Sequence, residues 1–122
     1  MFQGLRTIVY HVTELGRATE WYTALLGFGP YYDTPYYVGY NVGGYELGLH
    51  PAETSPAAPT PAIAVTYWGV DDIEAAHARL IKLGATARFE VTEVGEGIKL
   101  ADVIDPFGNI IGIIYNPHFK LP

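Results

Sequence analysis

Residues 8–27 read IVYHVTELGRATEWYTALLG, and residues 66–84 read TYWGVDDIEAAHARLIKLG. Each stretch has a short apolar run, then an acidic residue, then a helical pattern that ends at Leu and Gly. The two stretches align at a constant offset of 58, so that Glu14 corresponds to Asp72. Two copies are too few for a solenoid, so we expect the two units to bury their apolar faces against each other. Such a duplication predicts one cavity between its halves, and a functional site there.

Length and composition narrow the class of protein. A chain of 122 residues fits one domain, and no apolar stretch reaches the roughly 20 residues of a membrane span. No signal-peptide pattern follows Met1, so we expect a cytoplasmic protein. The absence of cysteine excludes disulfides, thiolate metal sites and cysteine nucleophiles. The net charge of −6 argues against a nucleic-acid partner, which requires clustered Lys and Arg.

The apolar periodicity predicts the same order of elements twice: a strand, a helix and three further strands. Helical stripes begin at Leu15 and at Ile73 and stop at Gly27 and Gly84. Asp71, with Glu74 three residues on, predicts a capping box. Strands are predicted at residues 5–12, 28–33, 36–41, 45–50, 63–70, 89–93, 98–104 and 110–115. A Pro-rich connector at 51–61 separates a first module at 1–50 from a second at 62–116, and a tail follows at 117–122.

Two motifs within this order carry a family resemblance. VTELGRATEWYTALLGF at 12–28 follows the first predicted strand, and DPFGN at 105–109 precedes the last one. The chain thereby resembles, over nearly its whole length, the vicinal oxygen chelate superfamily of glyoxalase I, bleomycin-resistance proteins and extradiol dioxygenases. The resemblance implies an α+β fold of two tandem βαβββ modules that form a cupped mixed sheet with helices on its outer face. The concave side would hold a small molecule, often beside a divalent metal. Asp105 itself is interpreted as a turn residue.

The resemblance also implies where metal ligands would lie. Carried over by motif spacing, the four positions are Thr7, Gly48, Val65 and Gly112. Glycine and valine side chains have no donor atom, and a neutral hydroxyl is a weak ligand for a divalent cation. We therefore expect no metal at the family's usual site and no cofactor, which weakens the glyoxalase and dioxygenase interpretations because both chemistries depend on the metal. The two glycines are expected to leave the floor of the cup open to a ligand.

Alternate residues of a strand share a face, so the same positions indicate what else faces the cup. The candidate catalytic residues are His11, Glu46 and His50. The candidate ligand-binding residues are Thr7, Val9, Tyr31, Tyr37, Gly48, Val65, Tyr67 and Gly112. Two histidines and one carboxylate leave open a relocated divalent metal site, or an acid/base role without metal.

Two functions remain open on this basis. The acidic charge, the ten tyrosines and the missing ligands favour a metal-independent protein that binds an aromatic or cationic small molecule. The family resemblance and the histidine–glutamate set favour a lyase or isomerase resembling glyoxalase I. We expect a homodimer, in which the modules pair within one chain or with those of the neighbouring chain. Neither a membrane nor a nucleic acid is expected as a partner.

Overall fold

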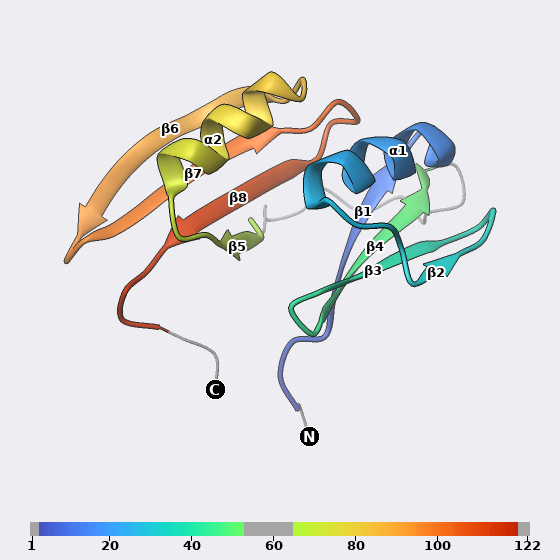
Figure 1. Ribbon diagram of the computed structural model, residues 1–122, viewed down its shortest axis with the longest axis horizontal. Helices are drawn as coiled ribbons and strands as arrows, with labels where there is room; N and C mark the ends of the chain where they lie inside the picture. Colours follow the sequence, from blue (N-terminus) through green and yellow to red (C-terminus); the bar gives the residue numbers. More distant parts are fainter. Residues whose placement is uncertain (1–2, 53–64, 120–122) are drawn as a thin grey trace, which may run out of the picture. The chain divides into compact units, whose positions relative to one another are not determined.

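The computed structural model describes residues 3–52 and 65–119, and the chain divides into two compact units, Met1–Pro61 and Ala62–Pro122. Within the described residues, each unit has one helix and one four-stranded mixed sheet, which confirms the α+β class and the duplication (Figure 1). The first unit contains β1 (Thr7–Val12), α1 (Leu15–Leu26), β2 (Tyr32–Asp33), β3 (Val38–Val42) and β4 (Tyr45–Pro51). The second contains β5 (Tyr67–Gly69), α2 (Ile73–Lys82), β6 (Thr86–Gly95), β7 (Ile98–Ile104) and β8 (Ile110–Tyr115). Neither helix is long and apolar enough to cross a bilayer, within the residues described.

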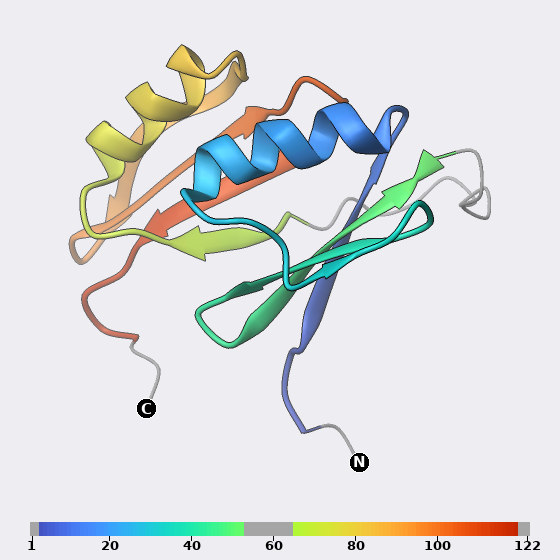
Figure 2. The same cartoon turned by 45° about the vertical axis from the view of Figure 1, so that its right-hand side comes forward.

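The two sheets have the same topology. Their strand orders are β1-β4-β3-β2 and β5-β8-β7-β6. In each unit the first strand pairs in parallel with the last, and the remaining neighbours are antiparallel (Figure 2). The parallel pair requires a crossover connection, and the helix with the two strands that follow it forms this connection. The repeat in the sequence is therefore a repeat of the hydrogen-bonding pattern.

In the first unit, α1 covers one face of the sheet. Ala18 and Tyr22 of the helix are buried, as are Leu47 and Leu49 of β4. The hydroxyl of buried Tyr40 donates to the Thr19 carbonyl of α1 at 2.9 Å, so the helix is held to this face by a hydrogen bond as well as by apolar contact. Since strand residues alternate, β4 presents its other residues to the opposite face of the sheet.

The cap of α2 corrects one prediction. Asp72 is the N-cap and accepts a hydrogen bond from the Ala75 amide at 3.1 Å, so the capping box predicted at Asp71 is wrong by one residue. Glu74 does not reach back to the cap; its carboxylate accepts from Lys99 Nζ of β7 at 3.2 Å. The cap position agrees with the internal repeat, in which Asp72 corresponds to Glu14, the N-cap of α1.

Helix positions and late strands were predicted best, and strand ends worst. The predictions at 98–104 and 110–115 are confirmed as β7 and β8. The strand predicted at 28–33 is wrong in extent, because only Tyr32 and Asp33 pair with β3. The strand predicted at 89–93 corresponds to β6, which is longer than predicted and pairs with β7 in an irregular register. Pro51 is the last residue of β4 and is buried. Residues 53–64 lie outside the described residues; they include most of the predicted connector and the start of the strand predicted at 63–70.

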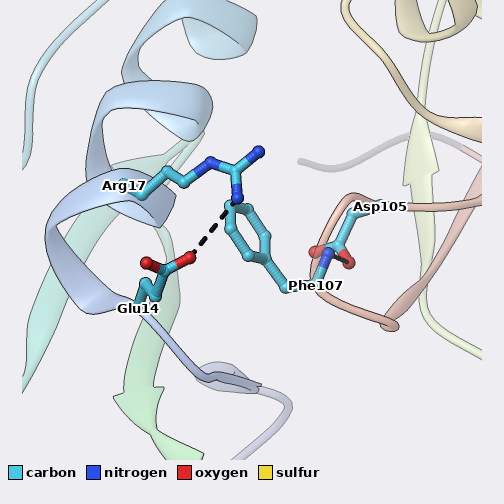
Figure 3. A network of polar contacts seen from close by, with 4 residues as sticks. All are labelled: Glu14, Arg17, Asp105 and Phe107. Carbon is cyan, nitrogen blue, oxygen red and sulfur yellow. Dashed lines mark hydrogen bonds and ion pairs between the residues drawn. The ribbon is translucent and has the colours of Figure 1, made fainter.

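The DPFGN motif is a turn, as interpreted from the sequence. The carboxylate of buried Asp105 accepts from the Phe107 amide at 2.9 Å, shown in Figure 3, and from the Asn109 amide at 2.7 Å. Gly108 follows with a φ of 93°, which glycine adopts at no steric cost. These bonds fix the entry of the chain into β8.

Candidate functional site

Three hydroxyl groups of the first unit converge on the carboxylate of Glu46. Oε1 accepts from the Tyr37 hydroxyl at 2.8 Å and from Thr7 Oγ1 at 3.1 Å, and Oε2 accepts from the Tyr31 hydroxyl. Glu46 lies on β4 and pairs directly with Thr7 across the parallel ladder. Its neighbours Leu47 and Leu49 alternate toward α1, so the carboxylate lies on the face opposite the helix.

Two glycines allow the tyrosines to reach this carboxylate. Gly39 and Gly48 pair across β3 and β4. A Cβ at Gly48 would overlap the Tyr37 hydroxyl, and a Cβ at Gly39 would lie 2.9 Å from Glu46 Oε2 and 3.2 Å from Tyr31 Cε1. Because both positions lack a side chain, the aromatic rings lie directly on the sheet.

The expectation of an open floor at the two glycines is therefore wrong. Tyr37 covers Gly48 in the first unit. In the second unit, Tyr67 covers Gly112, where a Cβ would lie 2.7 Å from the tyrosine ring. In both units a tyrosine occupies the space that the sequence left for a ligand.

Hydrogen bonds determine the charge state of the cluster formed by Glu46, Tyr31 and Tyr37. The Tyr31 hydroxyl, followed by that of Tyr37, lowers the pKa of Glu46 below the ordinary value of a glutamate, because both donate to the ionised form. Burial, and then the hydrogen bond to Glu46, raises the pKa of Tyr37. The hydrogen bond to Glu46 also raises the pKa of Tyr31. At neutral pH the cluster is therefore a carboxylate anion held by two neutral phenols.

A hollow of about 300 Å3 opens beside the carboxylate. Its size is at the lower end of the range for small-molecule sites. The guanidinium of Arg6 at its rim donates to the carbonyls of Gln3, Gly4 and Leu5, so it is engaged by its own segment. The residues that line the hollow are Arg6, Thr7, Tyr31, Asn41, Gly44, Tyr45 and Glu46.

The three candidate catalytic residues are not brought together. His11 and His50 pair across β1 and β4, with ring centroids 5.7 Å apart and planes at 73°. Glu46 lies four residues before His50 on the same strand, which places it about 13 Å away along β4. Tyr37 lies between them, hydrogen-bonded to Glu46 and in edge contact with the His50 ring.

The donor set does not fit a metal ion. In the described residues no group of three or more His, Cys, Asp or Glu side chains is arranged to hold one, so the relocated two-histidine, one-carboxylate site is not formed by these residues. At the family's usual positions, Thr7 donates to Glu46, and tyrosines fill the space above Gly48 and Gly112. Val65 supplies no donor.

The remaining sequence predictions divide between the two units. Thr7, Tyr31 and Tyr37 each donate a hydrogen bond to Glu46, and their role in ligand binding stays a prediction. Val9 pairs with Gly48 and is partly exposed. The second-unit candidates are Val65, Tyr67 and Gly112.

Sequence reasoning missed four residues that line the hollow: Arg6, Asn41, Gly44 and Tyr45. Asn41 is opposite Glu46 on β3, and alternation from Gly39 would have placed it on the same face. Arg6 precedes β1, and no periodicity marks a residue outside a strand.

The pKa of Glu46 offers a test of the cluster. Removing the two phenol donors with Tyr31→Phe and Tyr37→Phe should raise the pKa of Glu46 toward the ordinary value of a glutamate, as the ionised form loses its hydrogen bonds. Carbon-detected NMR titration of the Glu46 carboxyl measures this directly. Tyr36→Phe is the control, because Tyr36 is exposed and does not contact Glu46. Equal titration midpoints in the double variant and the wild type would contradict the assignment.

The lowered pKa of Glu46 also makes the stability of the folded protein depend on pH. Because the folded pKa of Glu46 is depressed, its contribution to stability is present above the unfolded pKa and is lost as pH falls through the folded value. The stability difference between the wild type and Glu46→Gln should therefore shrink on acidification.

Comparison with known proteins identifies the family. The family model "Glyoxalase/Bleomycin resistance protein/Dioxygenase superfamily" matches residues 4–113, and no curated protein gives a significant match. Similar solved structures include a glyoxalase-related enzyme from Fulvimarina pelagi, at 18% identity with a TM-score of 0.81 over 99% of this chain and 94% of that one. A glyoxalase/bleomycin resistance protein from Albidiferax ferrireducens matches at 22% identity and a TM-score of 0.72, over 93% and 98% of the two chains. A glyoxalase/bleomycin resistance protein/dioxygenase family enzyme from Burkholderia phytofirmans matches at 17% identity and 0.73, over 89% and 95%. The repeated βαβββ units and the family match over most of the chain lead to one conclusion: this chain belongs to the glyoxalase/bleomycin resistance protein/dioxygenase superfamily.

Proposed function

We propose that this chain is a small-molecule-binding protein of the glyoxalase/bleomycin-resistance type, which binds the cationic amine of an aromatic ligand at Glu46 without a metal. The observation that carries the proposal is the ionised Glu46 carboxylate, held by three hydroxyls on the wall of a hollow of about 300 Å3. The homodimer and the cytoplasmic location expected from the sequence stay predictions.

The geometry of Glu46 supports a cation as the group bound. A carboxylate has about four acceptor positions, and the described residues use three: two on Oε1 and one on Oε2. The fourth, on Oε2, is available to an ammonium group. Tyr31, with 64% of its surface exposed, and Tyr45 add ring faces to the same hollow, and such faces attract cations and aromatic rings.

The pKa directions favour binding over proton transfer. A general base works best when its pKa lies near the working pH, but the pKa of Glu46 is lowered. A general acid has the same requirement, but the pKa of Tyr37 is raised. Both shifts hold the groups in one charge state, which suits a fixed electrostatic contact.

A lyase or isomerase resembling glyoxalase I is the second candidate. The observation that favours it is the His11–His50 pair on the same face of the sheet as Glu46. An imidazole ring can donate or accept a proton, as an acid/base catalyst must. If an activity is found, His50→Gln should abolish it and leave amine binding unchanged.

Calorimetric titration with 2-phenylethylamine and with its uncharged analogue 2-phenylethanol tests the binding proposal. Glu46→Gln should weaken binding of the amine by about tenfold or more, the value of one lost charge-assisted hydrogen bond. Binding of the alcohol should not change. Glu20→Gln is the control, since Glu20 is an exposed glutamate of α1 outside the hollow. If Glu46→Gln and Glu20→Gln bind the amine equally tightly, Glu46 is not the cation site.

A further inference from the structure

The second unit contains a charged pair that the proposed function does not use. Arg88 of β6 donates from Nε to Asp102 Oδ1 at 2.8 Å and from Nη2 to Oδ2 at 2.9 Å. The Asp102 side chain is 4% exposed, whereas that of Arg88 is 42% exposed. Ala101 and Val103, the neighbours of Asp102, are buried on the α2 side, so the pair lies on the face opposite α2.

Stability alone does not explain this pair. Burying a carboxylate carries a desolvation penalty that its partner only partly repays, and well-packed apolar residues stabilise such a position as well or better. The strand around Asp102 is otherwise apolar, IKLADVI at 98–104. Arg88 lies at a register shift between Ala87 and Phe89, and irregular pairing of this kind often re-aims a side chain at a functional site.

The way in which Asp102 holds the guanidinium leaves one edge available. A guanidinium has five N–H donors, of which Asp102 takes one on Nε and one on Nη2. One donor on Nη1 and the second donor on Nη2 form the other edge, and no described residue accepts a hydrogen bond from them. Because Asp102 fixes the orientation of the group, this edge can bind a second oxyanion in a bidentate manner with little loss of conformational entropy.

An aromatic ring lies on the same face beside the pair. Tyr67 of β5 pairs with Gly112 of β8, which in turn pairs with Asp102 of β7. The Tyr67 ring covers Gly112 and is 41% exposed. Two strand spacings, about 10 Å, separate Tyr67 from Asp102. This spacing suits a small molecule whose ring contacts Tyr67 while its charged end reaches Arg88.

We infer that the Nη1/Nη2 edge of Arg88, positioned by Asp102, is a binding site for the carboxylate of a small aromatic acid, with Tyr67 contacting its ring. The site lies wholly within the second unit and does not depend on the amine site proposed at Glu46. Arg88 and Tyr67 contact the ligand, and Asp102 is a positioning residue that acts through Arg88.

Titration of the full chain with benzoate, followed by the Nε–Hε signals of arginine in 15N NMR spectra, tests the site. The Arg88 signal should shift in a saturable manner, and the signal of Arg79, an exposed arginine of α2, should not. Benzyl alcohol, which lacks the carboxylate, should leave both signals in place. If benzoate shifts Arg79 and Arg88 alike, or if benzyl alcohol shifts Arg88 as far as benzoate does, the inference is wrong.

Variants separate this site from the amine site. Arg88→Lys keeps the positive charge beside Asp102 but loses the planar guanidinium that donates two parallel hydrogen bonds. It should weaken benzoate binding by about tenfold, the value of one charge-assisted hydrogen bond. Arg79→Lys is the matched control and should bind benzoate as the wild type does. Glu46→Gln should weaken binding of 2-phenylethylamine and leave the affinity for benzoate unchanged. Unchanged benzoate affinity in a folded Arg88→Lys variant would overturn the assignment to Arg88.

Discussion

Replacing Arg88 by methionine is expected to lower the free energy of unfolding by about 3 kcal/mol, because the buried Asp102 carboxylate then lacks a compensating charge. Asp102 is the buried partner, at 4% exposure, and the cost arises from its carboxylate. Methionine retains an apolar stem of similar length, so little of the loss comes from packing. Urea denaturation followed by circular dichroism, compared between variant and wild type, measures the change.

A double variant distinguishes lost charge compensation from damaged packing. Arg88→Met combined with Asp102→Leu removes both charges, and apolar residues at such a position are often neutral or stabilising. Most of the lost stability should therefore return. If the double variant is less stable than Arg88→Met alone, the loss does not come from an unpaired Asp102.

An exposed ion pair provides the control for Arg88→Met. Arg17 donates to Glu14 at 3.3 Å within the first unit, and both side chains are mostly exposed (Figure 3). Exposed pairs contribute little, so Arg17→Met should cost less than about 1 kcal/mol. Equal losses for Arg17→Met and Arg88→Met would show that burial of Asp102 is not the cause.

The sequence predicted the elements that depend on local pattern. The helical stripes that begin at Leu15 and Ile73 and the last two strands have strong periodicity and clear stop signals, and they were found where expected. The turn at Asp105 was predicted because its residues specify their own backbone geometry. The cap at α2 was misplaced by one residue because Asp71 and Asp72 are adjacent, and only the backbone conformation selects between them.

The site was harder to predict because side chains from separate segments build it. Alternation placed Thr7 and Glu46 on one face, and their direct pairing in the parallel ladder agrees. It grouped Glu46 with His50 because both lie on one face, although their separation of four residues already implies about 13 Å along the strand. It also took Gly48 for an open floor, since a missing side chain looks the same in sequence whether a ligand or Tyr37 occupies the space.

The glycine of β8 gives the second large expected effect. Gly112→Ala should lower the free energy of unfolding by about 2 kcal/mol, the usual cost of overpacking a well-filled site. Its Cβ would lie 2.6 Å from the Thr66 carbonyl oxygen and 2.7 Å from the Tyr67 ring. The Thr66 carbonyl cannot easily withdraw, because it accepts a hydrogen bond from the Gly112 amide at 2.8 Å. Urea denaturation measures the loss, with the β5 glycine variant Gly69→Ala as control.

The two control positions separate steric overlap from the general effect of a new methyl group. Nothing lies within 4 Å of a Cβ at Gly69, so Gly69→Ala should be neutral or slightly stabilising through its effect on the unfolded chain. Gly48→Ala should fall between the two, because the overlapping atoms belong to the hydroxyl end of the Tyr37 ring, which can swing away at the cost of its hydrogen bond to Glu46. The pKa of Glu46 should rise in that variant alone, since Tyr37 then no longer donates to the carboxylate. Equal stability of Gly112→Ala and Gly69→Ala would contradict the steric argument, because a methyl group at Gly112 would then not overlap Thr66 or Tyr67.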